Sequence, residues 1–152
     1  MTVREISVRN LQRRIPVNVE ELERFADDAL KRCLQLKKGK RTNLRKANAT
    51  SVWLISDRRM SRLHLQFFGD NAPTDVITFH HGEIFISVET AERNAREFGN
   101  SLRNEIKLCI VHGLLHLHGF DDREAADLMR MKNTQESILR CMGVRIGTVS
   151  KV

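Results

Sequence analysis

The chain has 152 residues, of which 41% are hydrophobic and 30% charged, and this length and composition suit one globular domain with a core of its own. Its net charge of +7 favours association with polyanions such as nucleic acid or an anionic lipid surface, although charge alone indicates no chemistry. No apolar run approaches the roughly 20 residues that cross a membrane, and residues 1–16 lack the apolar core of a signal peptide.

Cysteine usage points to a reducing compartment. The three cysteines, Cys33, Cys109 and Cys141, are odd in number and scattered, so they indicate neither a disulfide framework nor a cysteine zinc site. We expect them to be small buried residues. Together with the N-terminal composition, this makes the cytoplasm the expected location.

The first half of the chain predicts two strands and two helices. A strand is predicted at residues 2–8, and a helix follows Asn18, which can cap it with Glu21 in the capping-box position. The β-rich segment 51–56 predicts a second strand. We expect Asp57 to cap the short helix after it, which ends near residue 67.

The stretch 37–46 holds six basic residues and no acid. One interpretation is a solvated loop whose cations lie near a helix C-terminus, where the helix dipole favours them. The other is a patch that contacts phosphates. No aromatic residue is interleaved for base stacking, so the stretch alone does not decide between them.

The second half predicts a hairpin followed by three helices. After a turn at residues 69–72, strands at 76–79 and 83–88 are joined so closely that they should be antiparallel. Helices are predicted at 90–98, 101–118 and 123–142, followed by a frayed tail at 145–152. Strands and helices that do not alternate regularly predict an α+β fold. We expect a single compact domain over residues 1–152, with a small mixed four-stranded sheet and about five helices.

One segment, 112–122, carries the pattern of a metal site. His112 and His116 are four residues apart, so on a helix they lie on the same face. Gly119 can end the helix in a left-handed turn, which lets the chain double back and bring Asp122 to the same ion. Zinc accepts imidazole and carboxylate ligands, and three protein ligands leave a position for water, whose pKa falls to about 7. We therefore expect one Zn²⁺ per chain, held by His112, His116 and Asp122.

Asp122 has a second interpretation, because Asp121 and Asp122 also precede the last predicted helix. Asp121 could cap that helix, with Asp122 as an acid favoured by the helix dipole. In that case the metal would have two protein ligands.

The other histidines fit a metal site less well. His118 lies about 120° away from the face that His112 and His116 share, so it should be a bystander. His64 is expected on the surface of a short helix. His80 and His81 lie in the hairpin turn, where polar residues are usual, although they could line a cleft.

Gly113 argues against peptidase chemistry. Zinc peptidases with this histidine spacing have a glutamate general base directly after the first histidine, and glycine cannot accept a proton. Apart from a metal-bound water, no catalytic group is apparent, and the proton acceptor must come from elsewhere or from a substrate phosphate.

Four segments of the chain resemble the YbeY family of metal-dependent endoribonucleases, and the resemblance covers nearly the whole length. They are residues 8–10 (VRN), 73–79 (PTDVITF), 82–87 (GEIFIS) and 112–121 (HGLLHLHGFD). The resemblance implies a compact α+β fold, a zinc ion, cleavage of single-stranded RNA, and a cytoplasmic role in ribosomal RNA maturation and ribosome quality control.

The chain departs from the family pattern at two positions. His112 and His116 match the first two zinc histidines of the family, but the third falls at Asp122. The arginine that the family usually shows five residues before the proline of the 73–79 segment falls at Phe68. An arginine can stabilise charge on a phosphoryl group, and phenylalanine cannot. The preceding helix offers three arginines as substitutes: Arg58, Arg59 and Arg62.

The leading hypothesis is a zinc-dependent, single-strand-specific endoribonuclease that matures ribosomal RNA, including the 3′ end of small-subunit RNA. Its partners would be precursor RNA and the ribosome or its small subunit, with no membrane and no DNA expected. The second hypothesis is a non-catalytic RNA- or ribosome-binding factor of the same fold, motivated by Phe68. The third and weakest is a metallopeptidase, because of Gly113.

Overall fold

The computed structural model describes residues 5–72 and 74–147, so residues 2–4 of the predicted first strand, Pro73 and residues 148–152 of the predicted tail lie outside the described part. Ten elements follow one another along this part of the chain. They are β1 (Glu5–Asn10), α1 (Val19–Leu34), α2 (Asn43–Lys46), β2 (Ala49–Ile55), α3 (Asp57–Phe68), β3 (Val76–Phe79), β4 (Glu83–Ser87), α4 (Val88–Phe98), α5 (Leu102–Leu117) and α6 (Ala125–Cys141).

The four strands form one mixed sheet in the order β1-β2-β4-β3. The pairs β1–β2 and β2–β4 are parallel, whereas β3 and β4 form the antiparallel hairpin that their short connection predicts. The predicted α+β class and mixed sheet are confirmed. Over residues 5–147 the structure has six helices rather than about five, because the four-residue helix α2 lies in the basic stretch and has no apolar periodicity to reveal it.

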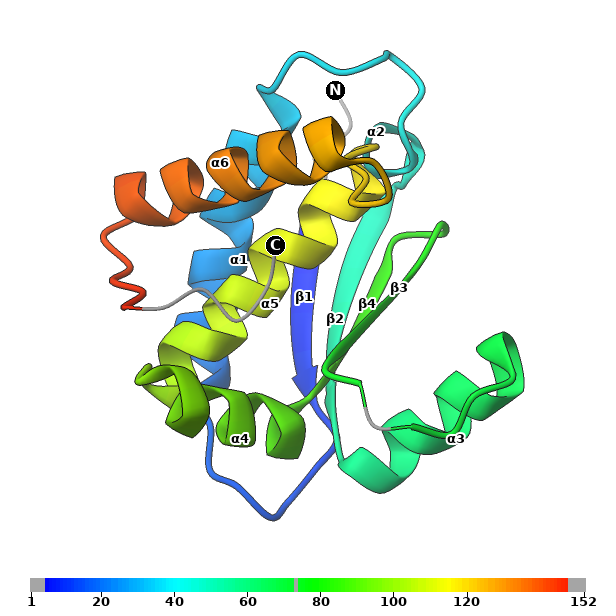
Figure 1. Cartoon of the computed structure of the whole chain (residues 1–152), viewed down its shortest axis with the longest axis vertical. Coiled ribbons are helices and arrows are strands. Elements are labelled where there is room, and N and C mark those ends of the chain that lie inside the picture. Colours follow the sequence, from blue (N-terminus) through cyan, green and yellow to red (C-terminus); the bar gives the residue numbers. More distant parts are fainter. Residues whose placement is uncertain (1–4, 73, 148–152) are drawn as a thin grey trace.

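Most of the core lies on one face of the sheet. Side chains alternate along a strand, so Val52, Leu54, Ile84 and Ile86 all point to the same face, where they pack in the main hydrophobic cluster with residues of α1, α5 and α6. Figure 1 shows these three helices, together with α4, gathered on that side of the sheet. This arrangement makes α5 the central helix of the domain.

The opposite face is covered by α3 through a smaller cluster. Ile55 and Ile77 of the sheet and Met60 of α3 are buried there, while Trp53 and Phe85 are only partly covered. In Figure 1, α3 lies apart from the other long helices. The second face of the sheet is therefore thinly covered and retains accessible aromatic side chains.

Side-chain caps fix the starts of α1 and α3. Asn18 caps α1 as predicted, its Oδ1 accepting a hydrogen bond from the backbone N–H of Glu21 at 3.1 Å. The prediction that Asp57 caps α3 is wrong, because Ser56 is the cap and accepts from the N–H of Arg59 at 3.2 Å. Asp57 lies in the first turn and instead forms an ion pair with Arg93 at 2.8 Å.

The approach of α5 to the sheet depends on Gly113. A Cβ atom added at this glycine would lie 2.9 Å from Cγ2 of Ile84 on β4, a fully buried side chain. The optimal separation of non-bonded carbon atoms is about 3.5–4.0 Å, so a contact at 2.9 Å is repulsive. Gly113 therefore lets α5, the helix that holds His112, lie closer to β4 than a residue with a side chain would.

The cysteines are free, and two of the three match the expectation of burial: Cys33 and Cys109 are buried, but Cys141 is exposed at the end of α6. Burial raises the pKa of the Cys33 thiol to about 12, so this cysteine is inert at neutral pH. None of the helices in the described part of the chain is long and apolar enough to span a membrane.

Candidate metal centre

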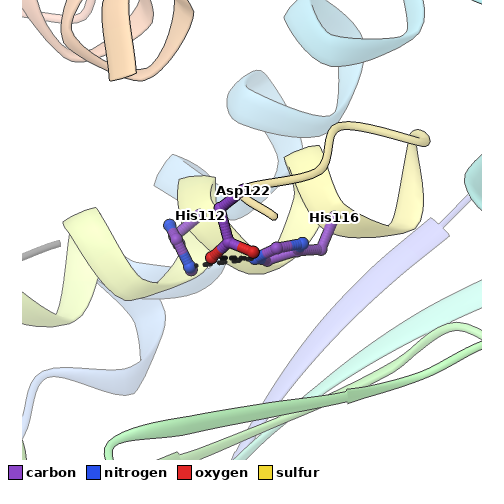
Figure 2. A group of neighbouring side chains, drawn as sticks. All are labelled: His112, His116 and Asp122. Atoms are coloured by element: carbon purple, nitrogen blue, oxygen red, sulfur yellow. Dashed lines mark hydrogen bonds and ion pairs between the residues drawn. The ribbon is translucent and has the colours of Figure 1, made fainter. Parts of the chain in front are cut away.

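Three side chains with metal-ligand chemistry converge at the C-terminal half of α5. His112 and His116 lie one helical turn apart, and their Nε2 atoms face each other at 3.1 Å. Oδ2 of Asp122 is 3.8 Å from Nε2 of His116, and ligand atoms from all three residues lie within 4.8 Å of one another. Figure 2 shows the Asp122 carboxylate turned toward both imidazoles. We call these three residues the triad.

Asp122 reaches the histidines because the chain reverses after α5. The helix ends at Leu117, and Gly119 has the left-handed φ of +89° that its position predicts. The N–H of Phe120 then donates to the carbonyl of Leu115 at 2.9 Å, which closes the turn. This local geometry carries the next residues back along the helix.

The competing interpretation of the two aspartates as helix caps is wrong. The N-cap of α6 is Glu124, and its side chain makes no capping hydrogen bond. Asp121 instead accepts from the side chain of Arg123, with an ion-pair distance of 2.6 Å, and this pairing lowers the pKa of Asp121 to about 2. The Asp122 carboxylate is thus left to face the histidines.

Both imidazoles are oriented through Nδ1. Nδ1 of His112 lies 2.8 Å from Oε1 of Gln135 on α6, and Nδ1 of His116 lies 3.2 Å from the carbonyl oxygen of Phe120. Both partners are acceptors, so we assign the proton of each ring to Nδ1. Each Nε2 then presents its lone pair to the middle of the triad, as a metal-binding imidazole does.

A divalent cation fits this arrangement. Two lone pairs facing each other at 3.1 Å repel unless a proton or a cation lies between them. Burial and the neighbouring His116 lower the pKa of His112 to about 4, so His112 carries no extra proton at pH 7. Two nitrogens bound to a tetrahedral zinc at about 2.0 Å would be about 3.3 Å apart, close to the observed separation. The triad could therefore hold Zn²⁺ through two nitrogens and a carboxylate oxygen.

The low pKa of His112 predicts how the stability of the metal-free protein depends on pH. Above the ordinary histidine pKa of 6.5, His112 is neutral in both the folded and the unfolded chain. Between pH 6.5 and about 4 only the unfolded chain gains the proton, so the free energy of unfolding falls as the pH falls. The loss from this group should be about 2 kcal/mol at pH 5 and about 3 kcal/mol near pH 4. Urea unfolding in a chelating buffer at pH 8, 6 and 5 measures it.

His112→Gln is the matched control for this measurement, because it retains a polar side chain without a titrating imidazole. The variant should lose less stability than the parent chain between pH 8 and pH 5. Equal losses in the two proteins would mean that His112 is not the group responsible.

The histidines of the triad open into a cleft of about 290 Å³ between α3, β3 and α5. Besides His112 and His116, six residues line it: His64, Phe68, Thr74, Val76, Ile77 and Thr78. His64 was expected on the surface of its helix. It is half-buried instead, and its Nδ1 lies 3.0 Å from the carbonyl oxygen of Ala72. The sequence signal that could have revealed the α3 side of the cleft is the four-residue spacing of His64 and Phe68, which places both on one face of that helix.

The remaining histidines lie apart from the triad. His118 is a bystander, as helical geometry predicts, and is fully buried, with Nδ1 3.0 Å from the hydroxyl oxygen of Thr42. His80 and His81 are exposed at the tip of the hairpin and do not line the cleft. Arg58, Arg59 and Arg62, the three suggested substitutes for the family arginine, do not line it either.

The basic stretch has two structural roles. Arg45 donates to the carbonyl oxygens of Leu34 and Leu36, both at 3.0 Å, and so holds the loop against the end of α1. Nζ of Lys38 lies 4.2 Å from the ring centre of Phe120, two residues before Asp122. Four of the six basic residues are exposed: Lys37, Lys40, Arg41 and Lys46. The loop thus lies close to the turn that follows α5.

Comparison with known proteins identifies the family to which the chain belongs. The chain matches the family described as "Endoribonuclease YbeY" over residues 7–143, a range that holds all four strands and six helices apart from the first residues of β1. The chain belongs to the endoribonuclease YbeY family. An endoribonuclease YbeY from Moorella thermoacetica is 34% identical over 93% of this chain and 99% of its own length. Another, from Heliobacterium modesticaldum, is 36% identical over 62% of this chain and 70% of its own length.

A solved structure agrees with this assignment. The solution structure of a Thermotoga maritima protein superposes with a TM-score of 0.58 at 26% identity and covers 91% of both chains. The resemblance to the YbeY family that was drawn from four short segments is therefore confirmed. Of the two residues at which the sequence predicts a departure from the family pattern, Phe68 lines the cleft and Asp122 belongs to the triad.

Proposed function

We propose that this YbeY-family chain is a metal-dependent endoribonuclease that holds one Zn²⁺ through His112, His116 and Asp122. The observation that carries the proposal is the convergence of three ligand-type atoms within 4.8 Å of one another, two of them from residues that line an open cleft. Membership of an endoribonuclease family supports RNA as the substrate. The net charge of +7 suits a polyanion.

The residues around the triad have distinct roles in this proposal. Gln135 and the carbonyl of Phe120 keep the two imidazoles in the tautomer that binds metal. The cleft admits the substrate next to the histidines. When bound, zinc would supply Lewis-acid chemistry, which activates water and neutralises charge on a phosphoryl oxygen. Since no glutamate follows His112, the proton acceptor is a group of the substrate or a residue outside the triad.

We further propose single-stranded ribosomal RNA precursors as substrates, including the 3′ end of small-subunit RNA, with a role in ribosome quality control. The ribosome or its small subunit would be the partner, the cytoplasm the location, and residues 1–152 one hydrolase domain. No membrane or DNA partner is expected. These finer assignments are supported by the family resemblance and by the basic surface.

A non-catalytic RNA- or ribosome-binding factor is the second candidate, and one observation favours it. Among the described residues, those that line the cleft include no arginine or lysine to stabilise a phosphoryl group. A metallopeptidase is the weakest candidate, because the contact of Gly113 with Ile84 leaves no space for a glutamate side chain.

The test is cleavage of a labelled single-stranded RNA by the purified full chain, together with its zinc content. We expect about one zinc per chain, cleavage that a chelator stops and added zinc restores, and no cleavage of DNA of the same sequence. Ribosome association without turnover at full zinc occupancy would favour the binding factor. Chelator-sensitive cleavage of a peptide would favour the peptidase.

A further inference from the structure

Five aromatic side chains of α3 and the sheet form a continuous series of ring contacts, which we call the aromatic strip: Phe67, Phe68, Phe79, Phe85 and Trp53. Phe79 joins its two ends. Its ring centre lies 4.9 Å from that of Phe67 and 6.5 Å from that of Phe68. On the other side it lies 5.6 Å from Phe85, which in turn stacks on Trp53 at 6.2 Å with an interplanar angle of 19°.

The strip is open to solvent at its α3 end. Phe67 and Phe68 are 55% and 56% exposed, and the other three rings are partly exposed. Single exposed apolar residues are ordinary on protein surfaces, whereas a contiguous apolar patch indicates a binding surface. Burying Phe67 and Phe68 within the chain would require α3 to lie flat on the sheet, and this helix buries only Met60 fully.

The α3 end of the aromatic strip lies next to the candidate metal centre. Phe68 is a wall of the cleft into which His112 and His116 open. Its ring also contacts that of His64, another wall residue, with 5.5 Å between ring centres. A molecule stacked on Phe68 would therefore extend directly toward the triad.

The far end of the strip is marked by a cation. Arg9 on β1 is in register with Trp53 on β2, and Trp53 with Phe85 on β4, so these residues project from the same face of the sheet. Arg9 is exposed, and it takes part in none of the ion pairs within residues 5–72 and 74–147. The strip thus connects a metal-type site at one end with a free positive charge at the other.

We infer that the aromatic strip is a stacking platform for unpaired RNA bases, with Phe68 holding the base next to the phosphodiester that enters the cleft. The inference deepens the proposed function and rests on it. Proteins that bind single-stranded RNA combine aromatic faces with backbone-contacting cations, which is the combination found along this strip. An apolar protein partner would gain nothing from the cation at the end of the strip or from the adjoining cleft.

The test measures RNA binding without cleavage, in a chelating buffer, with a short single-stranded RNA that carries the fluorescent base 2-aminopurine. Stacking on an aromatic ring should quench the probe. Phe68→Ala should weaken binding roughly 10-fold and remove much of the quenching, whereas Phe68→Tyr, which keeps the ring, should retain both. Leu65→Ala is the matched control, because Leu65 is on the same helix and similarly exposed at 54% but does not line the cleft.

Two further arms distinguish stacking from other causes. A fully paired duplex of the same sequence should bind Phe68→Ala and the parent chain equally, because its bases are not available to stack. Arg9→Gln should lower the dependence of single-strand affinity on salt, as expected for the loss of one phosphate contact.

Equal single-strand affinity of Phe68→Ala and the parent chain would overturn the inference. So would an equal loss with duplex, or a fall in self-association as the only effect of the substitution, which would assign the strip to contacts between copies of the chain. Because binding is measured without turnover, a failure of RNA cleavage would count against the proposed function and leave this test interpretable.

Discussion

His116→Ala will abolish both stoichiometric zinc binding and RNA cleavage. Removing the imidazole of His116 takes away one of two nitrogens that face each other at 3.1 Å and leaves the ion with His112 and a carboxylate. Loss of an outer-shell partner alone commonly costs about 10- to 100-fold in metal affinity or activity, so loss of a ligand should lower cleavage by more than about 100-fold. Zinc content and the single-turnover cleavage rate measure the two effects.

His81→Ala is the matched control for His116→Ala. His81 is exposed on the β3–β4 hairpin and does not line the cleft, so its replacement should change neither zinc content nor rate. His116 is partly exposed, with 27% of its side chain accessible, and its substitution should leave the fold intact. Cleavage by His116→Ala at the parental rate would show that the activity comes from another site or from a contaminating nuclease.

Substitutions of Asp122 should separate metal affinity from metal reactivity. Asp122→Ala removes the carboxylate that faces the two imidazoles and should weaken zinc binding by roughly 10- to 100-fold. Asp122→His should retain zinc and raise the cleavage rate, because a neutral ligand offsets less of the charge of the ion and leaves it a stronger Lewis acid. Competition with a chromogenic chelator gives the affinity, and cleavage at saturating zinc gives the rate.

Asp121→Ala serves as the neighbouring control for the Asp122 series. The carboxylate of Asp121 is paired with Arg123 rather than with the histidines, so its removal should leave zinc affinity unchanged. An Asp122→Ala protein that binds zinc as tightly as the parent chain would exclude Asp122 as a ligand and reduce the protein part of the site to two histidines.

Much of the fold follows from local sequence patterns. The β-rich composition of the segment that forms β2, the short hairpin connection and the Asn18 cap each depend on neighbouring residues, and the structure agrees with all three. The N-cap of α3 and the short helix α2 were not predicted, and the reasons are local as well. Ser56 and Asp57 are both good capping residues, and sequence alone did not show which one precedes the first helical turn. Helix α2 is too short to have a periodicity.

The candidate site was predictable only where its residues are close in sequence. The spacing of His112, His116 and Gly119 specifies a helix face and the turn after it, and the structure has both. Gln135 could not be assigned, since it meets His112 across an interhelical contact between α5 and α6. The sequence analysis considered Phe68 only as a position where the family usually has an arginine. Its ring contact with the sheet could not be predicted, because this contact depends on how α3 packs, and no sequence pattern specifies that packing.

The contact between Gly113 and Ile84 limits which new catalytic groups a substitution could introduce at this site. In zinc peptidases with the same histidine spacing, the position after the first histidine holds a glutamate, but here even a methyl group would lie 2.9 Å from a buried side chain of the sheet. A Gly113→Glu substitution would have to separate α5 from β4. This separation would disrupt the packing that holds both histidines in place. Single-residue changes can therefore alter the metal ligands and the cleft walls of this protein. A general base at position 113, next to His112, would in addition require α5 and β4 to pack against each other in a different way.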